Sequence, residues 1–202
     1  MRFAIFGDIH ANLHALEAVL ADTRDQGCTH SICMGDVVGY NAFPNECVAI
    51  VRELDCPVVK GNHDEQVSMD YTQEGLNPLA EEALDWTRNQ LGESEKDWLR
   101  ELRFQRLVRD FTVVHATLDT PHKWGYITSA LDAAASFTYQ HTQLCFIGHT
   151  HRPVVYVREG SVSMQPFETL QIEKNKKYLV NVGSVGQPRD GDWRAAYCIY
   201  DP

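Results

Sequence analysis

Basic residues are scarce in this sequence. Its 18 Lys and Arg are outnumbered by 28 Asp and Glu, which gives a formal net charge of -10 at pH 7. Proteins that bind the nucleic-acid backbone draw their affinity from clustered Lys and Arg, so this charge balance argues against a nucleic-acid polymer as partner. It does not exclude a small phosphorylated substrate, because bound divalent cations would reverse the field inside a local site.

Membrane and secretion signals are also lacking. No apolar run approaches the length that crosses a bilayer, so we expect no membrane partner. Met1 is followed at once by an expected strand, which leaves no room for the charged and apolar regions of a signal peptide. The six cysteines contain no C-x-x-C pair, and several lie inside apolar runs, which favours reduced buried thiols over a disulfide or soft-metal site. These features predict a cytoplasmic protein.

The chain has no linker rich in Pro, Ser or Gly, no low-complexity run and no internal repeat. With 202 residues, of which 44% are hydrophobic, it is long enough to bury a sizeable core without a metal or disulfide staple. We therefore predict one domain over residues 1–202.

Five apolar runs, each typical of a strand, end directly in Asp, Asn or His. In open α/β sheets, ligands gather outside the carboxyl ends of the strands. These five ends could therefore converge on one polar pocket, although they are scattered along most of the chain. The polar stretches are Gly7-Asp8-Ile9-His10, Gly35-Asp36, Lys60-Gly61-Asn62-His63-Asp64, His115 and Gly148-His149-Thr150-His151.

Capping residues and apolar spacing predict the helices. Asn12 precedes one helix, Pro44 opens a second, and Asn77 with Pro78 starts a third. Further helix starts are expected at Ser94 with Asp97, read as a capping box, and at Ser129 with Asp132. We expect Trp86 and Trp98 to be core residues of these helices.

The strands fall into two halves. Strands near 3–6, 29–34 and 57–59 alternate with helices, as right-handed parallel crossovers require, and are followed by a hairpin over 105–116 and a strand over 143–147. The last fifty residues resemble an antiparallel meander. Two sheets packed face to face with helices outside would satisfy both halves, so we predict an α/β (α+β) fold, a four-layer α/β/β/α sandwich of two mixed sheets. The meander strands are expected over 153–158, 161–165, 168–172, 177–182 and 195–200.

The polar stretches favour a metal centre. Asp, His and Asn without Cys form the ligand set of a hard-to-borderline divalent ion such as Mn, Fe, Zn, Ni or Co. Two acidic residues and four histidines exceed the needs of one ion. A carboxylate such as that of Asp36 could bridge two cations held ~3.5–4 Å apart, the spacing of two-metal hydrolytic sites.

In their order along the chain, the motifs GDIH, GDVVGYN, GNHD, the lone His115 and GHTH resemble those of the calcineurin-like metallophosphoesterases. The late stretch 181–189, NVGSVGQPR, is similar to that of small bacterial members described as phosphodiesterases or as relatives of serine/threonine phosphatases and diadenosine tetraphosphatase. The resemblance covers residues 1 to about 200 and implies the same four-layer sandwich.

The resemblance implies roles for the motif residues. A hydroxide shared by two ions, with Mn the most expected metal, would be the nucleophile. His63, oriented by Asp64, would protonate the leaving oxygen or stabilise charge on it. The first ion would take Asp8, His10, Asp36 and His151, and the second would take Asp36, Asn62, His115 and His149.

One departure from the family pattern bears on the substrate. Members that act on phosphoproteins typically have Asp-Arg-Gly after the second motif, where this chain has Gly39-Tyr40-Asn41. We therefore expect Tyr40 and Asn62 to border the substrate and Arg189, or alternatively Arg194, to clamp the phosphate.

These inferences predict a hydrolase for a small phosphorylated substrate that carries a phosphodiester or nucleotide-type phosphoanhydride. The alternatives are a phosphomonoesterase or serine/threonine phosphoprotein phosphatase, and a catalytically silent metal-binding scaffold for protein interactions. His122 is the other histidine expected to edge the pocket.

Overall fold

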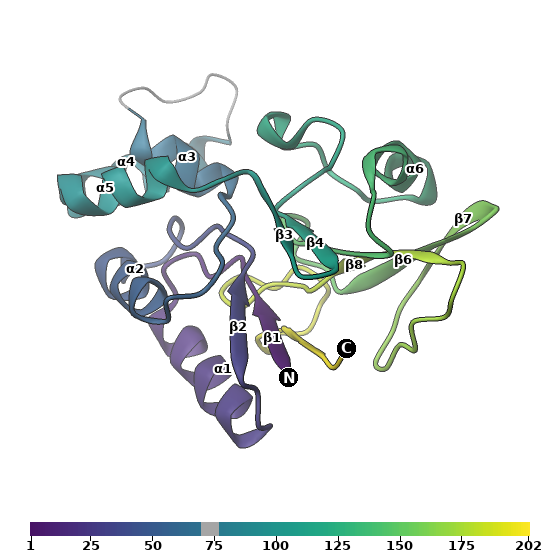
Figure 1. The fold of residues 1–202 in the computed structure, drawn as a ribbon. Coiled ribbons are helices and arrows are strands. Elements are labelled where there is room, and N and C mark those ends of the chain that lie inside the picture. The colour runs from purple at the N-terminus through teal and green to yellow at the C-terminus, as the bar shows by residue number, and fades with distance from the viewer. Residues whose placement is uncertain (70–76) are drawn as a thin grey trace.

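The computed structural model describes residues 1–69 and 77–202, which form two facing β-sheets with helices on their outer faces (Figure 1). In the smaller sheet, β1 (Phe3–Phe6) lies between a parallel neighbour, β2 (His30–Cys33), and an antiparallel one, β9 (Cys198–Tyr200). The helices α1 (Leu13–Asp25) and α2 (Pro44–Glu53) follow β1 and β2. Asn12 caps α1 as predicted, because its side-chain oxygen accepts a hydrogen bond from the Ala15 N–H at 3.2 Å.

The third strand predicted for the first half is reduced to isolated bridges, which pair Val58 with Cys33 and Val59 with Arg103. The chain turns at Gly61 into α3 (Asn62–Ser68), so the apolar run ends before a regular ladder can form. Its polar end still lies beside the loop that follows β2, because the Val59 N–H donates to the Cys33 carbonyl.

The larger sheet has the strand order β3-β4-β5-β8-β6-β7. The predicted hairpin is confirmed as β3 with β4, and β4, β5 and β8 run parallel. The strand bounds are β3 (Gln105–Val108), β4 (Phe111–Val114), β5 (Leu144–Ile147), β6 (Val154–Glu159), β7 (Ser161–Gln165) and β8 (Lys177–Asn181).

The predicted meander is wrong in its pairing. Only β6 and β7 form a hairpin, whereas β8 inserts between β5 and β6, and β9 crosses to the smaller sheet. Residues 168–172, which the structure describes, form no strand. The side chains of β8 are buried on both faces, with Tyr178 and Val180 on one and Leu179 on the other, so this strand suits the middle of a sheet and not its edge.

Two helices, α4 (Pro78–Gln90) and α5 (Glu93–Glu101), precede β3 in the chain. A short 3-10 turn, η1 (Pro121–Lys123), and the helix α6 (Ala130–Tyr139) connect β4 with β5. Asn77 caps α4 and Ser129 forms a capping box with Asp132, both as predicted. The capping box predicted at Ser94 is wrong, because the N-cap of α5 is the extended Gly92, two residues earlier, and Ser94 lies inside the first turn.

The core confirms the four-layer sandwich. Alternate residues of β1 point to opposite sides: Phe3 and Ile5 pack between the sheets, and Phe6 packs against α1 and α2. On the outer face of the larger sheet, Phe137 of α6 contacts the side chains around Leu179. Figure 1 shows α1 and α2 on one side of the paired sheets and α6 on the other.

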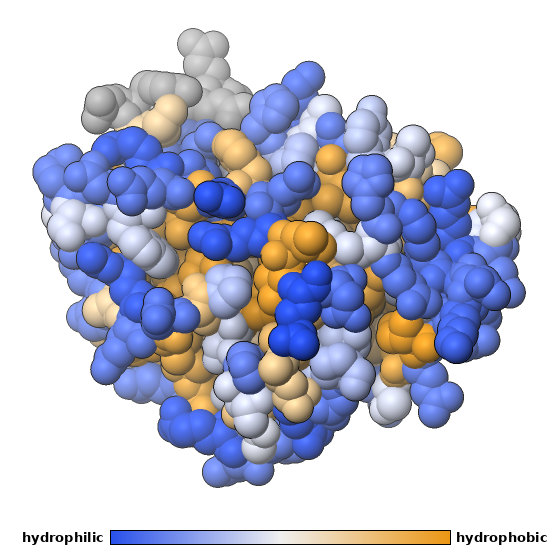
Figure 2. All heavy atoms as spheres, in the orientation of Figure 1, coloured by the Kyte–Doolittle hydropathy of each residue, from blue (hydrophilic) through white to orange (hydrophobic). Residues whose placement is uncertain are grey.

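The surface seen in Figure 2 is mostly hydrophilic, with smaller apolar areas between the polar side chains. Trp98 packs partly against the core, but Trp86 is 42% exposed, so its predicted place in the core is wrong. None of the helices within residues 1–69 and 77–202 has the length and apolar character that crossing a membrane requires.

Candidate metal centre

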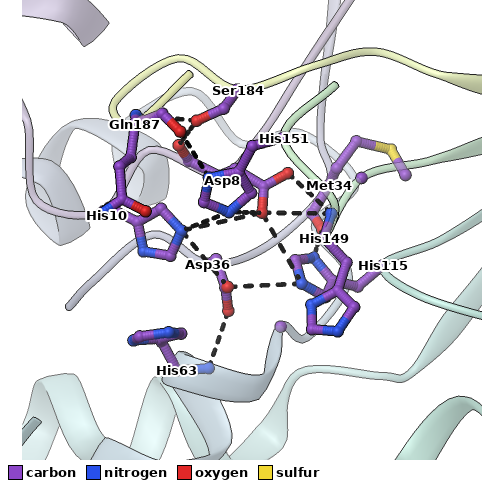
Figure 3. Close-up of polar contacts among 12 residues, drawn as sticks. Asp8, His10, Met34, Asp36, His63, His115, His149, His151, Ser184 and Gln187 are labelled. Carbon is purple, nitrogen blue, oxygen red and sulfur yellow. Dashed lines mark hydrogen bonds and ion pairs between the residues drawn. The ribbon is translucent and has the colours of Figure 1, made fainter. Parts of the chain in front are cut away.

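The polar ends of the five apolar runs meet at one place, where the side chains of Asp8, His10, Asp36, His115, His149 and His151 point toward one another (Figure 3). They form two groups that share Asp36, and within each group the potential ligand atoms lie within 4.8 Å of one another. All six residues are buried. The groups are Asp8, His10, Asp36 and His151, and Asp36, His115 and His149.

Main-chain carbonyls fix which ring nitrogen each histidine can offer to a metal. The Nδ1 atoms of His10, His115 and His151 lie 3.2, 2.8 and 2.6 Å from the carbonyls of residues 38, 34 and 187. A carbonyl only accepts, so each Nδ1 carries the proton and Nε2 faces the centre. His149 is reversed, because its Nε2 donates to the Trp124 carbonyl at 2.9 Å and leaves Nδ1 as the ligand. Such outer hydrogen bonds typically orient metal-binding histidines.

In the first group, acceptor atoms face one another at short distances. The Nε2 atoms of His10 and His151 are 3.1 Å apart, and the Asp8 Oδ1 lies 3.2 Å from the His151 Nε2. Burial lowers the pKa of His10 well below its usual value, which keeps this ring neutral. Lone pairs placed this close repel unless a cation lies between them, so the residues of this group fit a divalent ion.

Asp36 contributes to both groups through a single oxygen. Its Oδ2 lies 3.6 Å from the His10 Nε2 and 3.4 Å from the His115 Nε2. The other oxygen, Oδ1, accepts a hydrogen bond from the His63 main-chain N–H at 2.8 Å. The carboxylate is therefore held with one oxygen available to two sites, as a bridging ligand requires.

The second group differs in its protonation chemistry. Burial alone would lower the pKa of His115, but the carboxylates of Asp36 and Asp8 outweigh it and raise this pKa to about 10. Burial, with the neighbouring charge of His115, lowers the pKa of His149 to about 4. A positive charge between His115 and Asp36 is thus favoured, and either a proton or a metal ion can supply it.

The turns that aim these ligands hold strained backbone. Asp8, His10, Asp36, His149 and His151 all have positive φ angles, between 48° and 67°. Non-glycine residues rarely adopt this conformation, which costs roughly 1–2 kcal/mol per residue. Such strain persists where the surrounding contacts enforce it, and it clusters at functional sites.

Asn62 is the first residue of α3, and its Oδ1 is buried with no hydrogen-bond partner among the residues that the structure describes. An unpaired buried acceptor is costly unless a donor or a cation meets it. The residue before Asn62 is a glycine because there is no room for a side chain: a Cβ on Gly61 would lie 2.0 Å from the Asp36 Oδ1. Asn62 is therefore suited to complete the second group.

His63 lies next to Asp36 in the first turn of α3 and is 5% exposed. Its ring packs edge-on against His10, with the centroids 4.7 Å apart, and lies 4.5 Å from the ring of Tyr40. Asn62 and His63 are neighbours in a helix that rotates by about 100° per residue, so their side chains leave it in different directions.

Asp64 does not orient the His63 ring, so the role predicted for Asp64 is wrong. Its carboxylate accepts hydrogen bonds from the main-chain N–H groups of Asp36, Gly61 and Val37, at 2.8, 3.0 and 2.9 Å. Burial, with the nearby charge of Asp36, raises the pKa of Asp64 to about 7 against the effect of these donors. Asp64 thus ties the loop that carries Asp36 to the start of α3.

The whole sequence matches the calcineurin-like phosphoesterase superfamily domain, over residues 1–202. The chain belongs to this superfamily. An uncharacterized protein of Methanocaldococcus jannaschii is 37% identical over 206 residues, which cover 98% of this chain and 82% of that protein. The crystal structure of a metallophosphoesterase from Sphaerobacter thermophilus shares 40% identity and a TM-score of 0.88, over 100% of this chain and 84% of that one.

A more distant likeness shows how widely the fold is kept. A hypothetical protein from Pyrococcus horikoshii has a TM-score of 0.79 at 16% identity, over 99% of this chain and 83% of that one. The two-sheet fold is therefore shared with a protein of low sequence identity.

Of the predicted substrate residues, Tyr40 and Arg189 lie at the edge of the centre. The Tyr40 ring is 4.8 Å from that of His10, and the Arg189 guanidinium carbon is 6.0 Å from the Tyr40 ring. Gln187 holds this guanidinium through its side-chain oxygen, at 2.6 Å from Nη2. Arg194 instead forms an exposed pair with Asp192.

Sequence reasoning missed the aromatic segment after η1. The Trp124 carbonyl sets the tautomer of His149, and the Tyr126 ring stacks on the His149 ring. Two aromatic residues around a glycine carry no periodic signal, so only their position in space shows their role. His122, which we expected at the pocket edge, is exposed and contacts Phe104.

Proposed function

We propose that this protein is a dinuclear-metal phosphoesterase that hydrolyses a phosphodiester or a nucleotide-type phosphoanhydride. The observation that carries the proposal is the position of the Asp36 Oδ2, which faces His10 in one buried group and His115 in the other. A carboxylate oxygen shared by two ligand groups is the arrangement that holds two ions as a clamp on one phosphoryl group.

The residues fit two divalent ions, for which we expect Mn first and Fe, Zn, Ni or Co as substitutes. When bound, the ions would supply Lewis acidity and an activated water for attack on phosphorus. The ligands would be Asp8, His10, Asp36 and His151 for one ion and Asp36, Asn62, His115 and His149 for the other.

His63 is placed to act on the substrate. Its main-chain N–H is committed to Asp36 at 2.8 Å, which fixes the start of α3 next to the centre. Its ring packs against those of His10 and Tyr40, which also contact each other, and it belongs to neither ligand group. A ring in this position can donate a hydrogen bond or a proton to the leaving oxygen as the phosphorus–oxygen bond breaks.

The surroundings favour a singly charged diester over a doubly charged monoester. On the Tyr40 side of the centre lies the guanidinium of Arg189, which the side chain of Gln187 orients. Tyr40 stands where phosphoprotein phosphatases of this superfamily have an Arg, as the sequence showed. The side-chain amide of the next residue, Asn41, donates to the His10 carbonyl at 2.9 Å. A single oriented guanidinium can pair with the one negative charge that the non-bridging oxygens of a phosphodiester share.

A substrate panel with added Mn tests the proposal. We expect turnover of bis-p-nitrophenyl phosphate and of dinucleoside polyphosphates to exceed that of p-nitrophenyl phosphate and of phosphoserine or phosphothreonine peptides. Turnover of the monoester or the peptides alone would establish a phosphomonoesterase or a phosphoprotein phosphatase instead. Metal-loaded protein that turns over none of them would indicate the interaction scaffold.

The histidines offer a matched control for this panel. His151 is buried in the first ligand group, whereas His141 is exposed at the surface. His151→Ala should abolish turnover, and His141→Ala should leave it at the wild-type level.

We also propose a cytoplasmic location. All six cysteines are free thiols in the structure, which supports a reducing compartment. Fluorescence microscopy of a tagged full-length protein in its native host tests the location.

A further inference from the structure

An exposed tyrosine lies directly on one of the candidate metal ligands. The Tyr126 ring stacks on the His149 ring, with centroids 4.2 Å apart and an angle of 25° between the planes. His149 is only 4% exposed, whereas Tyr126 is 56% exposed. One face of the tyrosine ring is therefore covered by the metal centre, and much of the rest is open to solvent.

The segment that carries Tyr126 is anchored on both sides. Before it, the Trp124 indole N–H donates to Glu65 of α3 at 2.9 Å, and the Trp124 carbonyl accepts from His149. After it, Ile127 is buried, and its carbonyl accepts from the Tyr156 hydroxyl at 2.8 Å. An exposed aromatic ring between two fixed residues is pre-organised, so little freedom is lost when a ligand stacks on it.

Tyr40 borders the same centre from the loop after β2. Its ring contacts His10 and His63, on the side of the first ligand group, whereas Tyr126 covers His149 of the second group. The centre is thus flanked by two aromatic rings from distant parts of the chain. Such rings offer a planar substrate group a surface, whereas a phosphate alone needs only cations and hydrogen-bond donors.

We propose that Tyr126 is the stacking platform for a nucleobase, so that the substrates are phosphodiesters or phosphoanhydrides of nucleosides. This inference rests on the proposed function and narrows its substrate class. Tyr126 stacks directly on His149 of the second ligand group, so its open face lies close to the position of the bound phosphate. A base that is joined to this phosphate through its ribose can therefore reach the Tyr126 ring. Stacking accepts any base, because every base has a π-face, and thus sets the class of substrate without selecting one base.

Two substrates with the same leaving group isolate the effect of the base. Thymidine 5′-(p-nitrophenyl phosphate) and methyl p-nitrophenyl phosphate release the same phenolate and differ in the other ester group. With the Mn-loaded protein, Tyr126→Ala should lower kcat/KM for the thymidine ester roughly 10–100-fold, mainly through KM, and leave the methyl ester near wild type. Tyr126→Phe keeps the ring and should behave as wild type with both.

Two further variants separate stacking from support of the metal centre. Tyr126→Leu keeps an apolar cover on His149 without an aromatic face, and should lose the preference for thymidine while retaining wild-type metal content. Tyr139 is 57% exposed at the end of α6, so Tyr139→Ala is the matched control and should change neither substrate. Equal losses for both esters, or loss of metal in Tyr126→Leu, would overturn the platform and make Tyr126 a support for His149.

A binding measurement keeps this inference distinct from the proposed function. If the Mn-loaded wild type turns over neither ester, the proposed function fails, but the platform can still be tested by calorimetry. Thymidine monophosphate should then bind roughly 10–100-fold more tightly than methyl phosphate, and Tyr126→Ala should remove that difference. Equal affinities for the two ligands in the wild type would overturn the platform.

Discussion

Replacing Asp36 with Asn should weaken both ions of the proposed centre together. The Asp36 Oδ2 is 3.6 Å from a ligand nitrogen of one group and 3.4 Å from one of the other, so either ion would lie against the same oxygen. The amide is nearly isosteric with the carboxylate and keeps an oxygen for the His63 N–H. The change therefore removes a charge and leaves the local packing intact.

The charge sets the magnitude. Two unit charges 4 Å apart interact by about 4 kcal/mol at the effective dielectric of a protein site, and a divalent ion would raise this further. Since about 1.4 kcal/mol corresponds to a factor of ten, each ion should bind at least ~10³-fold more weakly in Asp36→Asn.

The assay is Mn titration by calorimetry, with metal analysis after dialysis. His151→Ala and His149→Ala, which each alter one group, should weaken mainly one ion. Asp110→Asn, at an exposed turn, should bind both ions as the wild type does. If Asp36→Asn keeps one ion at wild-type affinity, Asp36 does not bridge the centre.

Three further outcomes are expected. Replacing His63 with Asn should lower kcat on the order of 10²–10⁴-fold with bound metal unchanged. The loss should be larger for an alkyl than for a p-nitrophenyl leaving group. Equal losses for the two leaving groups would indicate that His63 binds the phosphate and is not the acid catalyst. Gly39→Ala should displace His63, because the glycine has a φ of +92° and the added Cβ would lie 2.3 Å from the His63 Nδ1. The kcat should therefore fall, while metal analysis still shows two ions. An unchanged kcat would contradict the position of His63 at the reacting group. In the chelated protein, the raised pKa of His115 should add stability that is fully present below about pH 6.5 and is lost as the pH rises toward about 10. Thermal unfolding across this pH range measures the effect, and Asp36→Asn should flatten it. A wild-type stability that does not change with pH in this way would contradict the predicted protonation of His115.

The side chains of the candidate centre could be read from the sequence because their positions are set locally. Asp8, Asp36 and His115 each follow an apolar run, and parallel strands deliver such residues to one edge of a sheet. The four-layer fold followed from the same patterns of hydrophobic residues, since the period of two along a strand such as β1 decides which residues lie between the sheets.

The pairing of the late strands could not be read in this way. A buried strand such as β8 has the same apolar pattern whichever neighbours it pairs with, and β9 is too short for its sequence to select a sheet. Both were decided by where the chain could close the two sheets around one core.

The hydrogen bonds that main-chain groups form with the site residues likewise could not be predicted from the sequence. The carbonyls that choose a ring nitrogen for each histidine, and the N–H groups that occupy Asp64, belong to every residue alike, so no pattern of side chains distinguishes them. Residue type and spacing along the chain were enough to predict which side chains would meet at the centre and that they suit divalent metals. The role of Asp64 in holding a loop and the cover that Tyr126 gives His149 could be seen only in three dimensions, because both depend on backbone and ring positions brought together from distant parts of the chain.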